Sequence, residues 1–339
     1  MKKISVYDAV GSILCHDITR IVPGEFKGAA FKKGHVVTAS DIPLLLELGK
    51  EHLYVWEDLP GQLHENQAAL RIATACAGAN ISLSAPSEGK INLVAERRAL
   101  VKVAEEVLLG INSVPEVIVA TRHNNQVVEA GAVVAGTRVI PLVIPEARVV
   151  EVEKICAERG PVVWAKPLLP KTMALVTTGN EIYYGRIADK FGPVIAAKAA
   201  AFDCFLLPQV LAPDDAEVIS QEIILLAQSG AEIIAVSGGM SVDPDDVTPR
   251  GIALAGGILV SYGAPVLPGS MFMLAYLGEI PIIGLPGCVM YCQTTILDLI
   301  LPRLLAGERL TQRDLAALGH GGLCLGCAVC HYPVCPFGK

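Results

Sequence analysis

The chain has 339 residues with a formal net charge of −7, and only 18% of its residues are charged. This length allows two domains that each bury a core, and the acidic balance without a block of lysine or arginine argues against a general nucleic-acid-binding surface. Glycines, prolines and a glutamate interrupt the most apolar region, 258–291, which predicts buried core rather than a membrane span. The N-terminus MKKISVYDAVGS lacks the apolar segment of a signal peptide, so we expect a cytoplasmic protein without a membrane partner.

Residues 1–165 predict an α+β domain. Helices are expected at 42–48, 64–77 and 99–111, and a strand at 52–56. Short β-rich runs separated by glycine, asparagine and proline follow at 116–120, 126–128, 132–134 and 139–144. The histidines here have no spacing that demands a metal or a catalytic triad, and we interpret them as structural.

Three prolines between Pro161 and Pro170 mark the expected boundary to a second domain at 171–306. Strands are expected at 173–177, 205–211, 232–236, 258–262 and 280–284, and helices at 193–202, 214–229, 246–255 and 290–305. Continuous apolar strands that alternate with helices predict a doubly wound, mostly parallel α/β sheet. Residues 307–339 are expected to form a linker and a cysteine-rich tail.

Glycine turns follow several of these strands, at 178–181, 237–246, 268–270 and 285–288. Ligands of parallel sheets bind outside the carboxyl ends of the strands, so the turns are expected to meet at one edge. Unshielded backbone N–H groups bind anions, and the nearby carboxylates suit a cation or a proton transfer. The pattern favours a pocket for a phosphorylated ligand. The alternative for 237–246 is an ordinary turn in which an aspartate caps the following helix.

At these motifs, the region 171–306 resembles the molybdenum-cofactor-biosynthesis domain, the molybdopterin-binding fold shared by molybdopterin molybdenumtransferase and molybdopterin adenylyltransferase. Thr178-Gly179-Asn180-Glu181 stands where the family usually has Thr-Gly-Asp-Glu, and the run from Ser237 to Ser241 is followed by Asp246. Pro268-Gly269 and Leu285-Pro286-Gly287 complete the match. Residues 1–165 look closer to the leading region of anaerobe molybdopterin-binding proteins of similar length.

The resemblance implies that Glu181 and Asp246 are the acidic residues that handle Mg²⁺, molybdate or nucleotide. It implies a cofactor-binding set of Thr178, Gly179, Asn180, Ser237, Gly238, Gly239, Ser241, Asp245, Pro268, Gly269, Ser270, Pro286, Gly287 and Cys288. Three positions depart from the family pattern. Ser270 stands where the family has lysine, Asp243 where it has glycine, and Cys288 where it has asparagine, so a phosphate site loses a positive charge and gains a negative one.

Cys288 and the tail carry separate thiol signals. A helix N-terminus at 288 would lower the pKa of Cys288 and make it a nucleophile or metal ligand, whereas the alternative is simple apolar packing. The tail reads Cys324-x2-Cys327-x2-Cys330-x4-Cys335-Pro336, in which four thiolates can close a tetrahedral shell. The spacing resembles a ferredoxin-type motif with one extra residue, so zinc and an iron–sulfur cluster both fit, with His320 and His331 as possible substitutes. A free tail is the alternative.

The leading functional hypothesis is a molybdopterin-binding protein of molybdenum or tungsten cofactor assembly, acting as a transferase that inserts metal into adenylated molybdopterin. Molybdopterin, molybdate or tungstate, an acceptor molybdoenzyme and a second copy of the chain are the expected partners. The first alternative is a non-catalytic carrier or sensor that uses the same pocket. The second is a nucleotide pyrophosphatase of the competence-damage-inducible type, because that family shares the fold.

Overall fold

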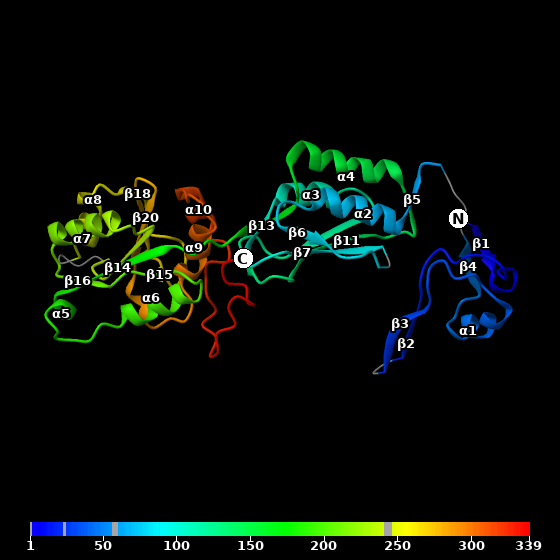
Figure 1. Cartoon of the computed structure of the whole chain (residues 1–339), viewed down its shortest axis with the longest axis horizontal. Helices are drawn as coiled ribbons and strands as arrows, with labels where there is room; N and C mark the ends of the chain where they lie inside the picture. Colours follow the sequence, from blue (N-terminus) through cyan, green and yellow to red (C-terminus); the bar gives the residue numbers. More distant parts are fainter. Residues whose placement is uncertain (1, 23–24, 56–59, 88, 241–245) are drawn as a thin grey trace. The chain divides into compact units, whose positions relative to one another are not determined.

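The computed structural model describes residues 2–22, 25–55, 60–87, 89–240 and 246–339, and the chain forms two compact units (Figure 1). Unit 1 comprises Met1–Glu96, Val103–Arg122 and Ala130–Ala165. Unit 2 comprises Arg97–Lys102, His123–Glu129 and Lys166–Lys339. Two short segments from the first half of the sequence therefore fold with the C-terminal unit.

The first part of unit 1 has a small core of its own. It contains the strands β1 (Lys2–Ser5), β2 (Ile18–Val22), β3 (Phe26–Phe31) and β4 (His52–Val55), the 3-10 turns η1 (Val6–Asp8) and η2 (Ala39–Asp41), and the helix α1 (Ile42–Glu47). Strand β1 pairs with β4 and β2 pairs with β3, both antiparallel. Val6, Leu14, Leu45 and Leu53 are buried together between them. The predicted helix at 42–48 and strand at 52–56 are confirmed within the described residues.

The remainder of unit 1 is built on a four-stranded antiparallel sheet in the order β6-β7-β11-β9. Its elements are β5 (Gln62–His64), α2 (Glu65–Cys76), β6 (Ile81–Leu83), β7 (Lys90–Ala95), α3 (Glu105–Asn112), β9 (Val117–Thr121), β11 (Val133–Val139), β12 (Val143–Pro145) and α4 (Glu146–Arg159). Helix α2 packs on β7 and β11 and is joined to α4 by the ion pairs of Arg71 with Glu146 and Glu153. Helices on one side of an antiparallel sheet confirm the α+β prediction.

The helix predicted at 99–111 is wrong in its first half. Residues Ala99–Val103 form the strand β8, which pairs with β10 (Val127–Val128) in the sheet order β10-β8-β13, and β13 is Val163–Pro167. Lys102 is the one partly exposed residue of β8. In a segment that is buried on both faces, apolar residues do not alternate with polar ones. The sequence pattern then cannot distinguish a helix from a strand. The helix α3 begins only at Glu105.

The core of unit 2 is a seven-stranded sheet in the order β15-β14-β17-β20-β19-β18, with β16 also paired to β14. The strands are β14 (Thr172–Thr178), β15 (Phe205–Leu206), β16 (Val210–Ala212), β17 (Ile233–Ser237), β18 (Ile258–Tyr262), β19 (Met273–Leu277) and β20 (Ile280–Leu285). The pairings of β14 with β15, β16 and β17, and of β17 with β20, are parallel. Strand β19 is antiparallel to both of its neighbours and was not predicted.

Helices cover both faces of this sheet. They are α5 (Asn180–Tyr183), α6 (Phe191–Ala200), α7 (Ala216–Gln228), α8 (Thr248–Leu254), η3 (Gly287–Met290), α9 (Ile296–Leu305) and α10 (Gln312–Ala317). Met173 and Leu175 of β14 pack with α6 and α9 on one face, whereas Ala174 and Val176 pack with α7 and α8 on the other. Alternate side chains of one buried strand thus serve two cores, which confirms the doubly wound, mostly parallel α/β fold. In the described ranges, no helix combines the length and apolarity needed to cross a bilayer.

Candidate ligand site at the carboxyl edge of the sheet

The sheet topology brings the four predicted glycine turns to one edge. Strands β14, β17 and β20 run in the same direction, so the turns that follow them lie together. Two successive antiparallel pairings, β20 to β19 and β19 to β18, return β18 to that same direction. The loop that holds Pro268, Gly269 and Ser270 follows β18 and therefore also reaches this edge. The short turn between β19 and β20 lies at the opposite edge.

Two adjoining cavities, of about 660 and 740 Å³, open at this edge. Phe191, Gly238, Gly239, Asp246 and Met290 line both of them. The larger cavity is also lined by Thr178, Gly179, Glu181, Lys190 and Asp214. The smaller is also lined by Pro268, Gly269, Ser270, Pro286, Gly287 and Cys288. Most of the predicted cofactor-binding residues therefore face a shared space whose middle is the Gly238–Gly239 turn.

Two constraints require glycine at position 238: its backbone φ is positive, and there is no room for a Cβ atom. Its φ is +92°, and a Cβ atom would stand 2.3 Å from the carbonyl oxygen of Thr178. Gly239 has a φ of +54°, and a Cβ there would stand 2.8 Å from Oγ1 of Thr248. Backbone with positive φ and no side chain is the geometry that presents N–H groups to an anion.

Two of the predicted residues support the turn instead of lining a cavity. The Ser237 side chain is fully buried, and its hydroxyl donates to Oγ1 of Thr177 at 3.2 Å. Asn180 pairs reciprocally with Asp214, whose carboxylate accepts from the Asn180 N–H at 2.9 Å. Thr178 lines the larger cavity while its hydroxyl donates to the carbonyl oxygen of Ser237 at 3.2 Å. These bonds fix the loop backbone on which the cavity depends.

The acidic residues lie on the larger cavity. Glu181 folds back over Gly179, where its Oε1 stands 3.0 Å from the position of a Cβ. Asp246 does not cap the following helix, because α8 begins at Thr248 with Val247 as its N-cap residue. Burial and the charge of Asp246 raise the pKa of Tyr262, whose hydroxyl donates to the carbonyl oxygen of Met240 at 3.0 Å. Ser241, Asp243 and Asp245 lie outside the described residues.

The structure does not supply the helix N-terminus that a lowered pKa of Cys288 would require. Residues Gly287–Met290 form a 3-10 turn rather than the start of an α-helix. Burial and the neighbouring Cys292 raise the pKa of Cys288 above its usual range. The thiol form is therefore favoured at neutral pH, which makes Cys288 a poor nucleophile.

Lys190 is a cavity residue that the sequence patterns did not single out. It precedes α6 and lines the larger cavity with Glu181 and Asp246. Lys190 therefore offers a cation to this space from the loop before α6. The only sequence signal was a lone lysine before a helix, which is usually a solvated surface residue.

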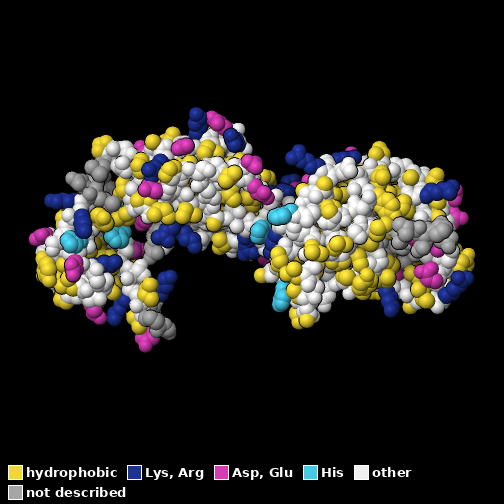
Figure 2. All heavy atoms as spheres, turned by 180° about the vertical axis from the view of Figure 1, so that it is seen from behind, with side chains coloured by type: hydrophobic (Ala, Val, Ile, Leu, Met, Phe, Trp, Pro, Cys, Tyr) yellow, Lys and Arg dark blue, Asp and Glu magenta, His cyan; other side chains and the backbone are white. Residues whose placement is uncertain are grey.

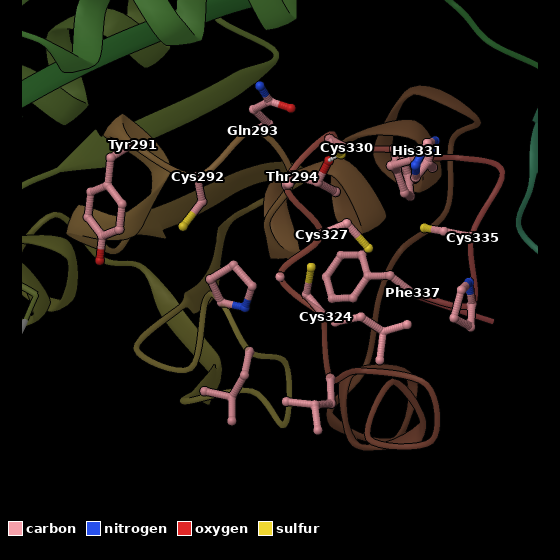
Figure 3. Close-up of a pocket in the computed structure, with 18 residues that line it drawn as sticks. Tyr291, Cys292, Gln293, Thr294, Cys324, Cys327, Cys330, His331, Cys335 and Phe337 are labelled. Carbon is pink, nitrogen blue, oxygen red and sulfur yellow. Dashed lines mark hydrogen bonds between the residues drawn. The ribbon is translucent and has the colours of Figure 1, made fainter.

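The tail cysteines lie beside this site but do not form a closed metal shell. Cys324, Cys327, Cys330 and Cys335 line one cavity of about 550 Å³ together with Cys292 and His331. Figure 3 shows the sulfur atoms of Cys324, Cys327 and Cys335 turned toward the middle of this cavity. Within the described part of the chain, no three His, Cys, Asp or Glu side chains stand close enough to hold a metal ion.

Comparisons with known proteins match two separate segments of the chain. Residues 174–306 match the family model described as a probable molybdopterin binding domain, and residues 3–57 match a domain of unknown function, DUF8806. A CinA-like protein of Mycobacterium sp. (strain MCS) is 32% identical over 79 residues, which are 23% of this chain and 19% of the relative. One of Mycobacterium leprae (strain TN) is 30% identical over 79 residues, 23% of this chain and 18% of the relative. The chain spans about a fifth of the length of these curated relatives.

Two solved structures are similar to part of the chain. The protein CinA of Thermoplasma acidophilum, described as of unknown function, is 18% identical with a TM-score of 0.35, covering 40% of this chain and 98% of that one. The molybdopterin biosynthesis enzyme MoaB of Thermus thermophilus is 20% identical with a TM-score of 0.33, covering 41% of this chain and 98% of that one.

The sheet, its helices and the glycine turns at its carboxyl edge define a doubly wound α/β domain with a candidate ligand site at that edge. The segment 174–306 belongs to the family of probable molybdopterin binding domains.

Proposed function

We propose that unit 2 binds molybdopterin, free or adenylated, and acts in the assembly of a molybdenum or tungsten cofactor. The observation that carries the proposal is the meeting of four glycine turns and two carboxylates, Glu181 and Asp246, around two adjoining cavities. The family match over residues 174–306 supports the choice of ligand.

Each part of the site has a distinct task. The N–H groups of Gly238 and Gly239 take the terminal phosphate, because no side chain shields them and the turn is held open by its hydrogen bonds to Thr248. Lys190 adds a positive charge on the same cavity. The apolar walls from Phe191, Met240 and Leu285 line the smaller cavity and suit a flat ring. A phosphate and a pterin ring therefore fit the two cavities in one extended ligand.

The carboxylates fit a divalent cation only together with a ligand. Magnesium in proteins takes one or two carboxylates, and phosphate oxygens of the substrate complete its shell. Glu181 and Asp246 on one cavity match this requirement, and no third protein group among the described residues closes the shell. In this site the cation would neutralise phosphate charge, and Asp246, which lines both cavities, would hold it between the two halves of the ligand.

A binding experiment tests this proposal directly. Titration of the full chain with molybdopterin is expected to show saturable binding that weakens by about 10-fold or more in Asp246→Asn. Asp203→Asn, an exposed aspartate away from both cavities, is the control. Absence of binding, or equal binding by the two variants, contradicts the proposal.

A single-turnover assay separates a transferase from a carrier or sensor. With adenylated molybdopterin, molybdate or tungstate and Mg²⁺, a transferase cleaves the adenylate and releases metal-loaded pterin. A carrier binds the same compound without cleaving it. In either case, Glu181 and Asp246 would be the carboxylates on this cavity that can take part in proton transfer.

The similarity to CinA-like proteins over 79 residues favours a second candidate, a nucleotide pyrophosphatase. The same cavity residues would then hold a pyrophosphate linkage between the glycine turn and Lys190. Metal-dependent hydrolysis of a dinucleotide, abolished in Asp246→Asn and not competed by molybdopterin, would establish this activity instead.

A further inference from the structure

The cysteine-rich tail holds its thiols in one cavity although few other forces organise it. The cavity of about 550 Å³ contains all four motif cysteines and Cys292. Residues 325–334 form no helix or strand, and the large apolar side chains Leu325, Val329 and Val334 are 70%, 67% and 80% exposed. Figure 1 shows this red segment as a loop that extends from unit 2, and Figure 2 shows hydrophobic atoms at its tip.

Both ends of the loop, in contrast, are fixed to the domain. The N–H of Cys324 donates to the carbonyl oxygen of Leu267 at 2.8 Å, and the N–H of Leu267 donates to the carbonyl oxygen of Gly322 at 2.8 Å. At the other end, the Phe337 side chain is buried in the main core of unit 2. The N–H of Gly338 donates to the carbonyl oxygen of Gly321 at 2.9 Å, which closes the base of the loop. Between these anchors, Tyr332 packs on the core while residues 325–330 are exposed, and a bound metal can order such a segment because its binding is coupled to folding.

We propose that Cys324, Cys327, Cys330 and Cys335 bind a thiophilic metal centre, either one zinc ion or an iron–sulfur cluster, and that this centre orders the loop. The spacing lets four sulfurs approach one point, and soft thiolates select such metals. Each thiol loses its proton to solvent as it binds, so no oxidant or reductant is needed for the zinc form. To bind the metal, Cys330 gives up the contact of its sulfur with the Thr294 hydroxyl at 3.2 Å, whereas the exposed residues 325–329 have little packing to lose.

The same centre acts on the neighbouring ligand cavity through a shared wall. Leu267 and Pro268 line both the thiol cavity and the smaller cavity of the candidate site. The backbone of Leu267 is also hydrogen-bonded to Gly322 and to Cys324, the two neighbours of Leu323 in the tail. Metal binding that fixes Cys324 therefore fixes the wall that carries Pro268 and Gly269. The tail centre is in this way a structural support for the site, whichever compound the site takes.

Cobalt binding tests the proposal without any pterin. The full chain, stripped of metal and kept reduced, is titrated with Co²⁺, and one equivalent is expected to give the sulfur-to-cobalt absorption of tetrahedral thiolate ligation. The variants for this test are Cys327→Ser and Cys330→Ser. Both cysteines are exposed, so the substitutions do not alter the core. Each is expected to weaken Co²⁺ binding by about 100-fold or more. Cys204→Ser, at a half-buried cysteine outside the cavity, is the control.

Two further measurements complete the test. Metal analysis and a visible spectrum of anaerobically purified protein distinguish zinc from a brown iron–sulfur centre. Amide exchange of residues 264–272 is expected to slow when metal is added. Absence of thiolate-to-cobalt absorption, or an unchanged spectrum in both serine variants, overturns the metal centre. Unchanged exchange at 264–272 in a metal-loaded chain overturns its support of the wall.

Discussion

The carboxyl edge of the seven-stranded sheet and the cysteine-rich tail both line cavities in unit 2, but their geometry is fixed by different means. At the sheet edge, buried strands, positive-φ glycines and hydroxyl hydrogen bonds hold the described loops. In the tail, backbone bonds hold the two ends while residues 325–334 carry exposed apolar side chains. The fold holds the described loops of the sheet edge in place, whereas the proposed metal centre would order the tail.

This difference follows from how much buried apolar surface supports each loop. The turns after β14, β17 and β20 extend strands that are buried throughout, so their positions are set by the two cores. The tail buries Phe337 and packs Tyr332 against the core, but its four motif cysteines are half-buried or exposed. A loop without a core beneath it needs a metal, a ligand or a partner to order it.

The first test changes a glycine in the turn after β17, at the carboxyl edge of the sheet. Gly238→Ala is expected to cost about 4 kcal/mol of unfolding free energy, because it combines backbone strain at positive φ with a Cβ pressed on Thr178. Gly287→Ala is the matched control: this glycine lines the same smaller cavity, but nothing lies within 4 Å of its Cβ. Urea unfolding measures both. Equal stability of the two variants would show that the turn is not fixed as described.

A second test removes a mostly buried carboxylate from the core of unit 2. Glu308 lies 2.7 Å from Lys102 and 2.8 Å from Arg303, and its side chain is only 9% exposed. Glu308→Gln is expected to cost about 3 kcal/mol, since it removes the carboxylate that pairs with Lys102 and leaves Arg303 with Asp314 alone. Glu279→Gln, which breaks the exposed pair with Arg309, is expected to cost less than about 0.5 kcal/mol. If Glu308→Gln lowers the free energy of unfolding as little as Glu279→Gln does, the buried ion pairs do not stabilise the fold.

The same network predicts an acid dependence. Burial alone would raise the pKa of Glu308, but the bonds from Lys102 and Arg303 outweigh it and hold the pKa at about 2. Because the folded pKa is lowered, this stabilisation is full above the unfolded pKa of about 4.3 and is lost as the pH falls toward about 2. Urea unfolding between those pH values should show a smaller loss in Glu308→Gln than in the unchanged protein. Parallel pH curves would contradict the assignment.

A third test weakens the charge of the candidate site without moving its backbone. Lys190→Ala is expected to reduce affinity for the phosphorylated ligand by about 10-fold, or about 1.4 kcal/mol, and to lower the salt dependence of binding. Arg250→Ala, on the exposed side of α8 near Glu217, is the control. Isothermal titration at two salt concentrations measures the effect. If Arg250→Ala weakens binding as much as Lys190→Ala, the charge acts at long range rather than in the cavity.

The smallest expected effect concerns the anchor of the tail. The Tyr332 hydroxyl donates to the carbonyl oxygen of Asp298 at 3.1 Å, and burial raises the pKa of Tyr332. Tyr332→Phe is expected to cost about 1 kcal/mol and to speed proteolysis within 325–334. Tyr184→Phe, at an exposed tyrosine, is the control. Proteolysis that is unchanged by Tyr332→Phe would indicate that the loop is held by other contacts.

Most strands and helices of unit 2 could be predicted from the amino-acid sequence alone. Continuous apolar runs predicted β14, β17 and β20, because a strand buried on both faces must be apolar throughout. The signals Asp215 and Gly230 placed α7, and Asp215 does accept from the N–H groups of Glu217 and Val218. Turn glycines at the strand ends then placed the candidate site at the carboxyl edge, since parallel strands share that edge.

The partners of the side chains, in contrast, are known only from the folded structure. Whether Ala99–Val103 is helix or strand depends on its pairing with β10, which follows only after α3 and β9 in the chain. Ser237 faces Thr177 instead of a ligand, and Lys190 reaches the cavity from a loop that no motif marks. Among the described residues, the tail thiols share a cavity without closing a shell. Local patterns fix backbone conformation because it is set by neighbouring residues, whereas side-chain partners come from distant segments that only the folded chain brings together.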